Sequence, residues 1–192
     1  MINGSDLTFI DLFAGCGGLS LGLEQSGFIP LFVNELNSDA LETYLINREE
    51  DYPYLRDSKF HASDIKDCVK NDKFFYDLFK NLQKKHKRDF QKNRVDLIVG
   101  GPPCQGFSGI GLRRSYSVEK NQLPSNQLFQ DMAYFIHMIR PKVFLFENVE
   151  GLLRGRWSKD GEKGEIFEEV FETFNNIPDY FVKYKLVRAF QY

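Results

Sequence analysis

Short apolar runs alternate with amphipathic stretches along the 192 residues. A short apolar run between turn residues is typical of a buried strand, and an amphipathic stretch between two such runs is typical of a helix that connects parallel strands. We expect strands at residues 7–13, 31–35, 95–99 and 143–146, a short strand or its end at 64–65, and an extended segment at 180–189. We expect helices at residues 19–25, 38–47, 72–91, 127–139 and 165–175. The pattern predicts an α/β fold with a doubly wound, mostly parallel sheet.

A cysteine follows two prolines where the fourth apolar run ends, in the sequence GGPPCQGFS at residues 100–108. Each proline fixes its own φ and restricts the residue before it, so the chain leaves the strand at a rigid corner. Ligands of open α/β sheets bind at the carboxyl ends of the strands, which makes Cys104 a candidate nucleophile. The alternative is a buried structural cysteine, the commoner role of a single cysteine. The surrounding sequence favours the nucleophile.

A glycine-rich turn, DLFAGCGG at residues 11–18, joins the first strand to the first helix. Glycines allow the backbone to approach a ligand closely and leave free N–H groups where a helix begins. Glu35 ends the second strand, where Rossmann-like folds place a carboxylate on ribose hydroxyls. A dinucleotide fingerprint would require glycine at position 20, where Ser20 stands. NAD binding is therefore a weaker alternative that the turn leaves open.

Three other side chains near strand ends have two interpretations each. Phe13 could stack on an adenine or belong to the core. Asp64 could accept a hydrogen bond from an adenine amino group or cap a turn, and capping is favoured for this residue taken alone. Glu147 ends the fifth strand, next to the fourth in a doubly wound sheet, so it should reach the same edge as Cys104 and could act on one planar substrate. Its alternative role is to cap the following turn.

The composition is that of a globular protein with a net charge of −2. A free-standing nucleic-acid binder usually has a basic surface, and the one basic run, at residues 80–94, is interpreted as the solvated face and end of a helix. The short polar N-terminus and the lack of a long apolar run predict neither a signal peptide nor a membrane span. Three cysteines without a framework spacing and three scattered histidines predict reduced thiols, no metal site and a cytoplasmic protein.

Taken together, these segments resemble the DNA cytosine-5 methyltransferases, in particular those of bacterial restriction-modification systems. The resemblance rests on residues 11–18, on Asn34-Glu35, on Asp64-Ile65, on GPPCQGFS at 101–108 and on ENVEGL at 147–152. These motifs occur in the order and spacing of the family and span nearly the whole chain. The resemblance implies a Rossmann-like, S-adenosylmethionine-dependent methyltransferase fold, with S-adenosylhomocysteine as the product of the methyl donor.

The resemblance also implies a set of cofactor contacts. Phe13 would stack on the adenine of S-adenosylmethionine, Glu35 would hold its ribose hydroxyls, and Asp64 would contact the adenine edge. The backbone of the glycine turn would line the methionine part. The cofactor-binding residues implied in this way are Phe13, Gly15, Gly17, Glu35, Asp64, Ile65 and Pro102.

The same resemblance implies that Cys104 and Glu147 are catalytic. Cytosine C5 is too poor a nucleophile to take a methyl group unaided, and a Cys104 thiolate bonded to C6 would make the ring an enamine. Glu147 would bind N3 and the 4-amino group and so balance charge as the adduct forms. The target base would be flipped out of duplex DNA, because C6 is hidden in the base stack. The implied substrate-binding residues are Gln105, Ser108, Asn148, Arg113 and Arg114.

The family's later motifs are not found before Tyr192. We therefore expect residues 1–192 to be the N-terminal part of a catalytic domain, with the target-recognition region and C-terminal motifs absent and the sheet incomplete at its C-terminal strands. Such a chain should methylate DNA weakly or not at all by itself. Three alternatives remain: a subunit of a split enzyme, whose partner chain carries the missing motifs; a non-enzymatic module that keeps the fold and binds only cofactor or protein; and a tRNA cytosine-5 methyltransferase. The intact Cys104 and Glu147 disfavour the non-enzymatic module.

Overall fold

The computed structural model describes residues 6–103, 127–158 and 160–191. The chain divides into two compact units. The first comprises Met1–Pro102 and Tyr134–Glu147, and the second comprises Pro103–Ala133 and Asn148–Tyr192. The predicted site residues Cys104, Gln105, Ser108, Arg113 and Arg114 lie outside the described residues.

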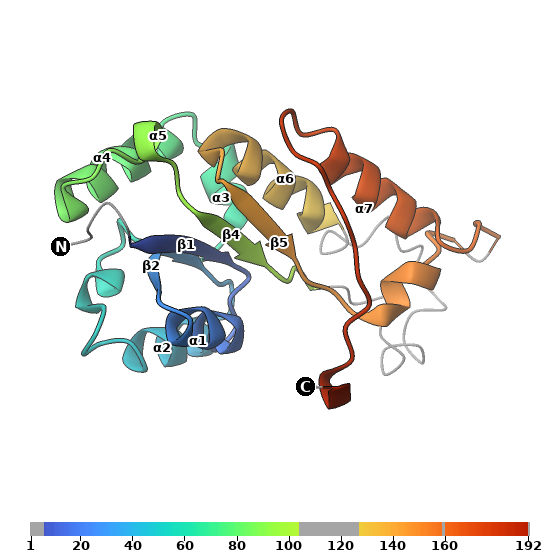
Figure 1. The fold of residues 1–192 in the computed structure, drawn as a ribbon, viewed down its shortest axis with the longest axis horizontal. Helices are drawn as coiled ribbons and strands as arrows, with labels where there is room; N and C mark the ends of the chain where they lie inside the picture. Colours follow the sequence, from blue (N-terminus) through green and yellow to red (C-terminus); the bar gives the residue numbers. More distant parts are fainter. Residues whose placement is uncertain (1–5, 104–126, 159, 192) are drawn as a thin grey trace. The chain divides into compact units, whose positions relative to one another are not determined.

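A five-stranded sheet forms the centre of the first unit (Figure 1). Its strands are β1 (Leu7–Leu12), β2 (Phe28–Asn34), β3 (His61–Ala62), β4 (Leu97–Gly100) and β5 (Val143–Phe146). The order is β3-β2-β1-β4-β5, and every neighbouring pair is parallel. The strand order reverses between β1 and β4, which is the doubly wound arrangement that the sequence predicts. In the described part of the chain, β5 is an edge strand.

Helices cover both faces of this sheet (Figure 1). They are α1 (Gly18–Gln25), α2 (Ser38–Ile46), α3 (Ile65–Lys70), α4 (Phe74–His86), α5 (Phe90–Asn93) and α6 (Leu128–Ile139), with a short 3₁₀ turn η1 (Pro53–Arg56). α1 and α2 lie on one face, and α3 and α4 lie on the other. On the second face, Phe32 of β2 stacks on Phe135 of α6 at 6.0 Å and meets Phe74 of α4 edge to face at 5.7 Å. These rings fix the layers through non-local apolar contacts.

Two expected elements are wrong in detail. The helix expected over residues 72–91 is divided into α4 and α5, because Lys87 adopts a left-handed conformation (φ 57°) and Asp89 then caps α5. The strand expected at 64–65 ends earlier, at Ala62. The Asp64 carboxylate accepts a hydrogen bond from the Lys66 N–H at 2.9 Å, so Ile65 begins α3 instead. In both places an aspartate side chain caps the N-terminus of the helix that follows.

β2 contains one residue more than its partner strand. Phe9 of β1 pairs with Pro30, but Ile10 pairs with Phe32, so Leu31 is left over and forms a bulge. Proline has no N–H to donate to the ladder, which makes its position the natural place for the irregularity. The Pro30 carbonyl oxygen accepts a hydrogen bond from the Tyr54 hydroxyl instead. The pairing register of β1 with β2 therefore shifts by one residue between Phe9 and Ile10.

A buried carboxylate links three strands at the end of the sheet where the strands begin. Asp96, which precedes β4, accepts hydrogen bonds from the Thr8 N–H at 2.9 Å and the Thr8 hydroxyl at 2.8 Å. Lys142, just before β5, donates to its other oxygen at 2.6 Å. Burial works against the ionised form, but the bonds from Lys142 and Thr8 hold the pKa of Asp96 below its ordinary value. Asp96 thus ties β1, β4 and β5 together.

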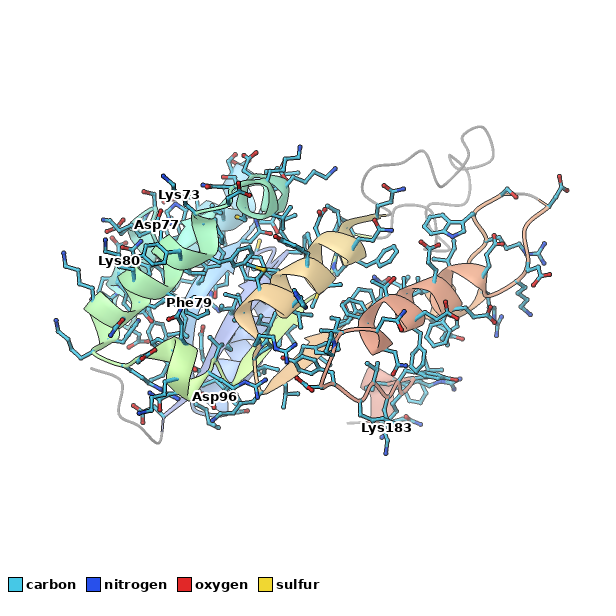
Figure 2. The ribbon with its side chains drawn as sticks, turned by 90° about the horizontal axis from the view of Figure 1, so that it is seen from above. Lys73, Asp77, Phe79, Lys80, Asp96 and Lys183 are labelled. Carbon is cyan, nitrogen blue, oxygen red and sulfur yellow. The ribbon has the colours of Figure 1, made fainter. Side chains whose placement is uncertain are left out.

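The outer face of α4 is charged, as the sequence predicts. Figure 2 shows Lys73, Asp77 and Lys80 projecting away from the sheet. The basic run is not wholly solvated, however. Arg88 is buried, and half-buried Arg94 donates to the carbonyl oxygens of residues 140 and 141. The expectation for residues 80–94 is therefore confirmed for the lysines and wrong for the two arginines.

The second unit contains η5 (Glu150–Arg154), α7 (Glu165–Asn175) and η6 (Ala189–Gln191). α7 occupies the expected range and buries three side chains at helical spacing, Ile166, Val170 and Phe174. Residues 180–188, expected to be extended, pair with no strand of the described chain. Among the described residues, no helix is both long and apolar enough to cross a membrane.

Candidate active site

The predicted site residues of the first unit gather at the carboxyl edge of the sheet. Leu12 at the end of β1 pairs with Asn34 on one side and with Gly100 on the other. Gly100 in turn pairs with Phe146 at the end of β5. The residues that follow these four positions therefore leave the sheet side by side. This places the glycine turn, Glu35, Gly101 and Glu147 along one edge.

The glycine turn departs from ordinary backbone geometry at three positions. Phe13 has φ 59°, Gly15 has φ 55° and Gly17 has φ 88°. For phenylalanine this left-handed conformation is unfavourable by about 1–3 kcal/mol and persists only where its surroundings impose it. The Ala14 N–H donates to the Asn34 carbonyl oxygen at 3.0 Å, which holds the strained segment against β2. Phe13 is half-buried at this edge.

Glu35 closes the turn from the neighbouring strand. One carboxylate oxygen accepts a hydrogen bond from the Gly15 N–H at 2.8 Å, and the other accepts from the Asn37 N–H at 2.7 Å. Each carboxylate oxygen retains capacity for a second bond, so Glu35 can still accept hydroxyl donors. The sequence predicts this carboxylate at the end of the second strand, and the structure brings it into contact with the glycine turn.

A buried amide positions the loop after β3. Asn34 is 1% exposed, and its Nδ2 donates to the carbonyl oxygens of Ala62 at 3.2 Å and Ser63 at 2.7 Å. These bonds fix the approach to Asp64, which is half-buried, and to Ile65, which is buried. The predicted capping role of Asp64 is confirmed, and one of its oxygens is engaged in that cap. Its contact with an adenine stays a prediction.

Glu147 lies against the corner that leads to Cys104. Its N–H donates to the Gly100 carbonyl oxygen at 3.0 Å, which continues the β4–β5 pairing by one residue. A Cβ atom at Gly101 would lie 2.9 Å from Glu147 Oε2, so a side chain at residue 101 would displace the carboxylate from its present position. Glu147 is exposed, whereas Pro102 is buried. The structure therefore juxtaposes Glu147 and the Gly-Pro-Pro corner, as the sequence predicts.

Asn148 begins the part of the chain that belongs to the second unit. Its side-chain oxygen accepts a hydrogen bond from the Val149 N–H at 2.9 Å. This local bond stabilises the turn into η5. Its predicted role on the substrate side stays a prediction.

A buried polar chain behind the glycine turn was not predicted from the sequence. Ser20 donates to the Asp11 carboxylate at 2.6 Å, and its hydroxyl lies 2.9 Å from that of Tyr44. Since Ser20 has one proton and gives it to Asp11, Tyr44 is the donor to Ser20. Burial raises the pKa of Asp11 to about 7. Arg48 completes the group, with Nη2 donating to the Gly17 carbonyl oxygen at 3.0 Å.

Nothing in the sequence marks these four residues as a set. Asp11 adjoins the glycine motif, but Tyr44 and Arg48 lie near the end of a separate helix and are ordinary surface types there. The available signal was the helical spacing of residues 44 and 48, one turn apart and directed to the same side. Their partners, more than twenty residues earlier in the chain, could not be identified from that spacing.

The residues of this edge fit S-adenosylmethionine. A Cβ placed at Gly15 or Gly18 meets nothing within 4 Å, so the turn has an open side that a ligand can approach. Gly17, the N-cap of α1, offers no side-chain acceptor to the first N–H groups of the helix, which suits a carboxylate. Glu35 stands next to the turn with free acceptor capacity. The strained Phe13 is a further mark of a functional site.

The chain matches the family model described as C-5 cytosine-specific DNA methylase over residues 7–192. Type II methyltransferase M1.HphI of Haemophilus parahaemolyticus is 32% identical over 184 residues, covering 95% of this chain and 41% of that protein. Type II methyltransferase M.AgeI of Thalassovita gelatinovora is 38% identical over 144 residues, covering 75% of this chain and 28% of that protein.

A similar solved structure is described as a DNA modification methyltransferase encoded within a prophage (E. coli). It gives a TM-score of 0.56 at 28% identity and covers 87% of this chain and 37% of that chain. The Rossmann-like, S-adenosylmethionine-dependent methyltransferase fold predicted from the sequence is thereby confirmed. This chain spans less than two thirds of the length of each relative. The family match also decides against the NAD alternative, and the chain belongs to the C-5 cytosine-specific DNA methylase family.

Proposed function

We propose that this chain carries the catalytic part of an enzyme that transfers a methyl group from S-adenosylmethionine to C5 of cytosine in duplex DNA. We propose further that residues 1–192 are the N-terminal part of that catalytic domain, and that target recognition depends on sequence beyond them or on a second chain. The family assignment and the methyltransferase relatives support the reaction class.

One observation carries the proposal: the Glu147 carboxylate lies against Gly101, at the start of the corner that presents Cys104. The parallel pairing of β4 with β5 up to Gly100 and Phe146 holds these two segments in register. Glu147 thus lies at the edge of the sheet where the segment leading to Cys104 begins, and this supports the proposal that both act on one base. A planar base that contacts Cys104 through C6 could be held by Glu147 through N3 and the 4-amino group.

The mechanism follows from the reactivity of cytosine. The Cys104 thiolate forms a bond to C6, and the displaced electron pair makes C5 nucleophilic. Glu147 stabilises the developing charge at N3, where a positioned group typically contributes 10²–10³-fold or about 3–4 kcal/mol. Once C5 carries the transferred methyl group, loss of the C5 proton and cleavage of the S–C6 bond restore the aromatic ring and the thiolate.

The cofactor site is the glycine turn together with Glu35. When bound, S-adenosylmethionine supplies an electrophilic methyl group. Glu35 would accept hydrogen bonds from the ribose hydroxyls with the lone pairs that Gly15 and Asn37 leave unused. Phe13 would stack on the adenine, and Asp64 with Ile65 would contact its edge. Gln105, Ser108, Arg113, Arg114 and Asn148 are proposed to contact the DNA.

Trapping with 5-fluorocytosine tests the reaction. Fluorine at C5 cannot leave as a proton, so the S–C6 bond formed by the nucleophile persists. The chain is incubated with S-adenosylmethionine and random-sequence duplex DNA that contains 5-fluorocytosine, and covalent complexes are resolved on denaturing gels. We expect a complex that disappears in Cys104→Ser and falls at least about 100-fold in rate in Glu147→Gln.

Glu150→Gln is the matched control, since Glu150 is an exposed carboxylate that pairs with Arg154 at 3.9 Å. Parallel reactions contain 5-fluorocytosine tRNA. A complex with tRNA alone would replace the DNA proposal by the RNA alternative. A complex that survives Cys104→Ser would refute the assigned nucleophile. Binding of S-adenosylhomocysteine without any complex, also after addition of a second chain that carries the target-recognition region and the C-terminal motifs, would reduce the function of this chain to cofactor binding.

A further inference from the structure

The Arg48 guanidinium is buried directly behind the glycine turn. Arg48 follows α2 and is only 4% exposed. It donates three hydrogen bonds to three segments: Nη2 to the Gly17 carbonyl oxygen at 3.0 Å, Nη1 to the Tyr44 carbonyl oxygen at 3.2 Å, and Nε to Glu24 Oε1 at 2.6 Å. Its plane also lies 3.9 Å from the Tyr44 ring centroid. One side chain thus connects α1, α2 and the turn between β1 and α1.

The turn has one packed side and one open side. A Cβ at Gly17 would lie 2.6 Å from Arg48 Nη1 and 2.7 Å from the Tyr44 ring. At Gly15, by contrast, a Cβ would meet nothing within 4 Å. The guanidinium therefore packs against the turn at Gly17, whereas the turn is open at Gly15.

The Gly17 carbonyl oxygen connects Arg48 to the first turn of α1. It accepts the Arg48 bond and also the bond from the Leu21 N–H at 3.0 Å, which is the first bond of α1. Gly17 has φ 88° and no side chain to cap the helix. The orientation of its peptide therefore sets the direction of the first N–H groups of α1. Arg48 is the side chain that fixes this orientation from outside the turn.

Only arginine suits this position. Its planar fork can donate in three directions at once, whereas lysine is a point charge on a flexible stem. The buried charge is balanced by Glu24, whose side chain is 13% exposed. Substitution by a neutral residue would strand that carboxylate, which is why a test needs both a charge-conserving and a charge-removing variant.

We propose that Arg48 is a positioning residue for cofactor binding, which holds the Gly17 peptide so that the turn and the start of α1 are pre-organised for S-adenosylmethionine. The proposal rests on the proposed function in assuming that this turn holds the cofactor. It assigns to Arg48 no contact with the cofactor or with DNA.

The test uses three variants of the full chain. Arg48→Lys keeps the charge and loses the fork. The double variant Arg48→Met with Glu24→Gln removes both members of the buried ion pair, so neither charge is stranded. Arg56→Lys is the matched control, because Arg56 is more exposed and pairs with Glu42 and Glu49 away from the turn.

Two measurements are made on each variant, at a temperature where far-ultraviolet circular dichroism shows it fully folded. Residue-resolved amide hydrogen exchange follows the Gly17 and Leu21 N–H groups, with Val99 in β4 reporting global opening. Calorimetry gives the dissociation constant of S-adenosylhomocysteine. For both Arg48 variants we expect exchange at Gly17 and Leu21 to accelerate, and the dissociation constant to rise, by about tenfold or more. Val99 exchange in Arg48→Lys and all values in Arg56→Lys should match the unmodified chain.

Each outcome decides the proposal. Unchanged exchange at Gly17 and Leu21 in Arg48→Lys overturns it, whether or not the chain binds the ligand. Faster exchange with an unchanged dissociation constant overturns the link to the cofactor. If the unmodified chain binds no S-adenosylhomocysteine, the proposed function is overturned, and exchange alone decides whether Arg48 positions the turn.

Discussion

Replacing Asp11 by asparagine should remove a loss of stability that the unmodified protein shows as the pH rises from about 5 to about 8. Asp11 is 1% exposed, and burial raises its pKa from 3.8 to about 7. In the unfolded chain the carboxyl ionises near its ordinary pKa, while the folded protein retains the proton up to about pH 7. Its contribution to stability is therefore fully present below about pH 3.8 and is lost as the pH rises to about 7.

The size of the effect follows from the shift. A difference of about three units corresponds to about 4 kcal/mol over the whole range, at 1.36 kcal/mol per unit. Between about pH 5 and pH 8, about 2–3 kcal/mol of this is lost, because part has already gone below pH 5. Asparagine has nearly the same shape and can still accept the Ser20 hydrogen bond at its side-chain oxygen. The substitution thus removes the titration and keeps the contact.

Urea unfolding at several values of pH measures the effect. The free energy of unfolding of Asp11→Asn minus that of the unmodified protein should increase by about 2–3 kcal/mol between about pH 5 and pH 8, so the variant gains stability relative to the unmodified protein. Other titrating groups are common to both proteins and cancel in the difference. Asp39→Asn, which alters an exposed carboxylate of α2 in the same way, is the control. Parallel profiles for Asp11→Asn and the unmodified protein would refute the claim that Asp11 is protonated when folded near neutral pH.

Three further predictions concern the same framework. Gly17→Ala should cost clearly more stability than Gly15→Ala in thermal unfolding. Both glycines have positive φ, but only a Cβ at residue 17 would lie 2.6 Å from a buried guanidinium. Equal losses of stability would contradict the close packing of Arg48 against Gly17. Asp96→Asn should lower the free energy of unfolding by about 2–4 kcal/mol. Lys142→Met should lower it by at most about 1 kcal/mol, because the Lys142 side chain is 52% exposed. The reverse order would contradict the role of Asp96 in holding β1, β4 and β5 together. Glu35→Gln should weaken S-adenosylhomocysteine binding about tenfold or more by calorimetry, and unchanged affinity would remove Glu35 from the cofactor site.

The parallel sheet and its functional edge were predictable because they depend on local pattern. Apolar runs identify the strands, and the rule that ligands of open α/β sheets bind at the carboxyl ends places Glu35 and Glu147 at one edge. The capping role of Asp64 was also accessible, since a short polar side chain before a helix is a local signal. These inferences need no knowledge of which helix packs on which.

The remainder depends on contacts that sequence patterns do not encode. Lys87 ends α4 in a left-handed conformation that most residues avoid, so the continuous helix expected from the pattern was wrong. The bond from Arg48 to Gly17 joins residues 31 positions apart in the chain. It exists only because α1 and α2 pack on the same face of the sheet. A buried arginine on a polar helix end is indistinguishable in sequence from a solvated one.

The bulge in β2 determines which face of the sheet each later side chain occupies. Side chains alternate along a strand, so the extra Leu31 reverses the alternation from that point on. With it, Phe32 and Asn34 point to one face while Glu35 reaches the glycine turn on the other side. Because Ile10 already pairs with Phe32, deleting Leu31 would give an unbroken ladder that keeps Phe32, Asn34 and Glu35 on their present faces. The bulge therefore accommodates one extra residue without moving the site, whereas a regular ladder that paired Leu31 with Ile10 would shift the register by one residue and turn Asn34 and Glu35 to the opposite faces.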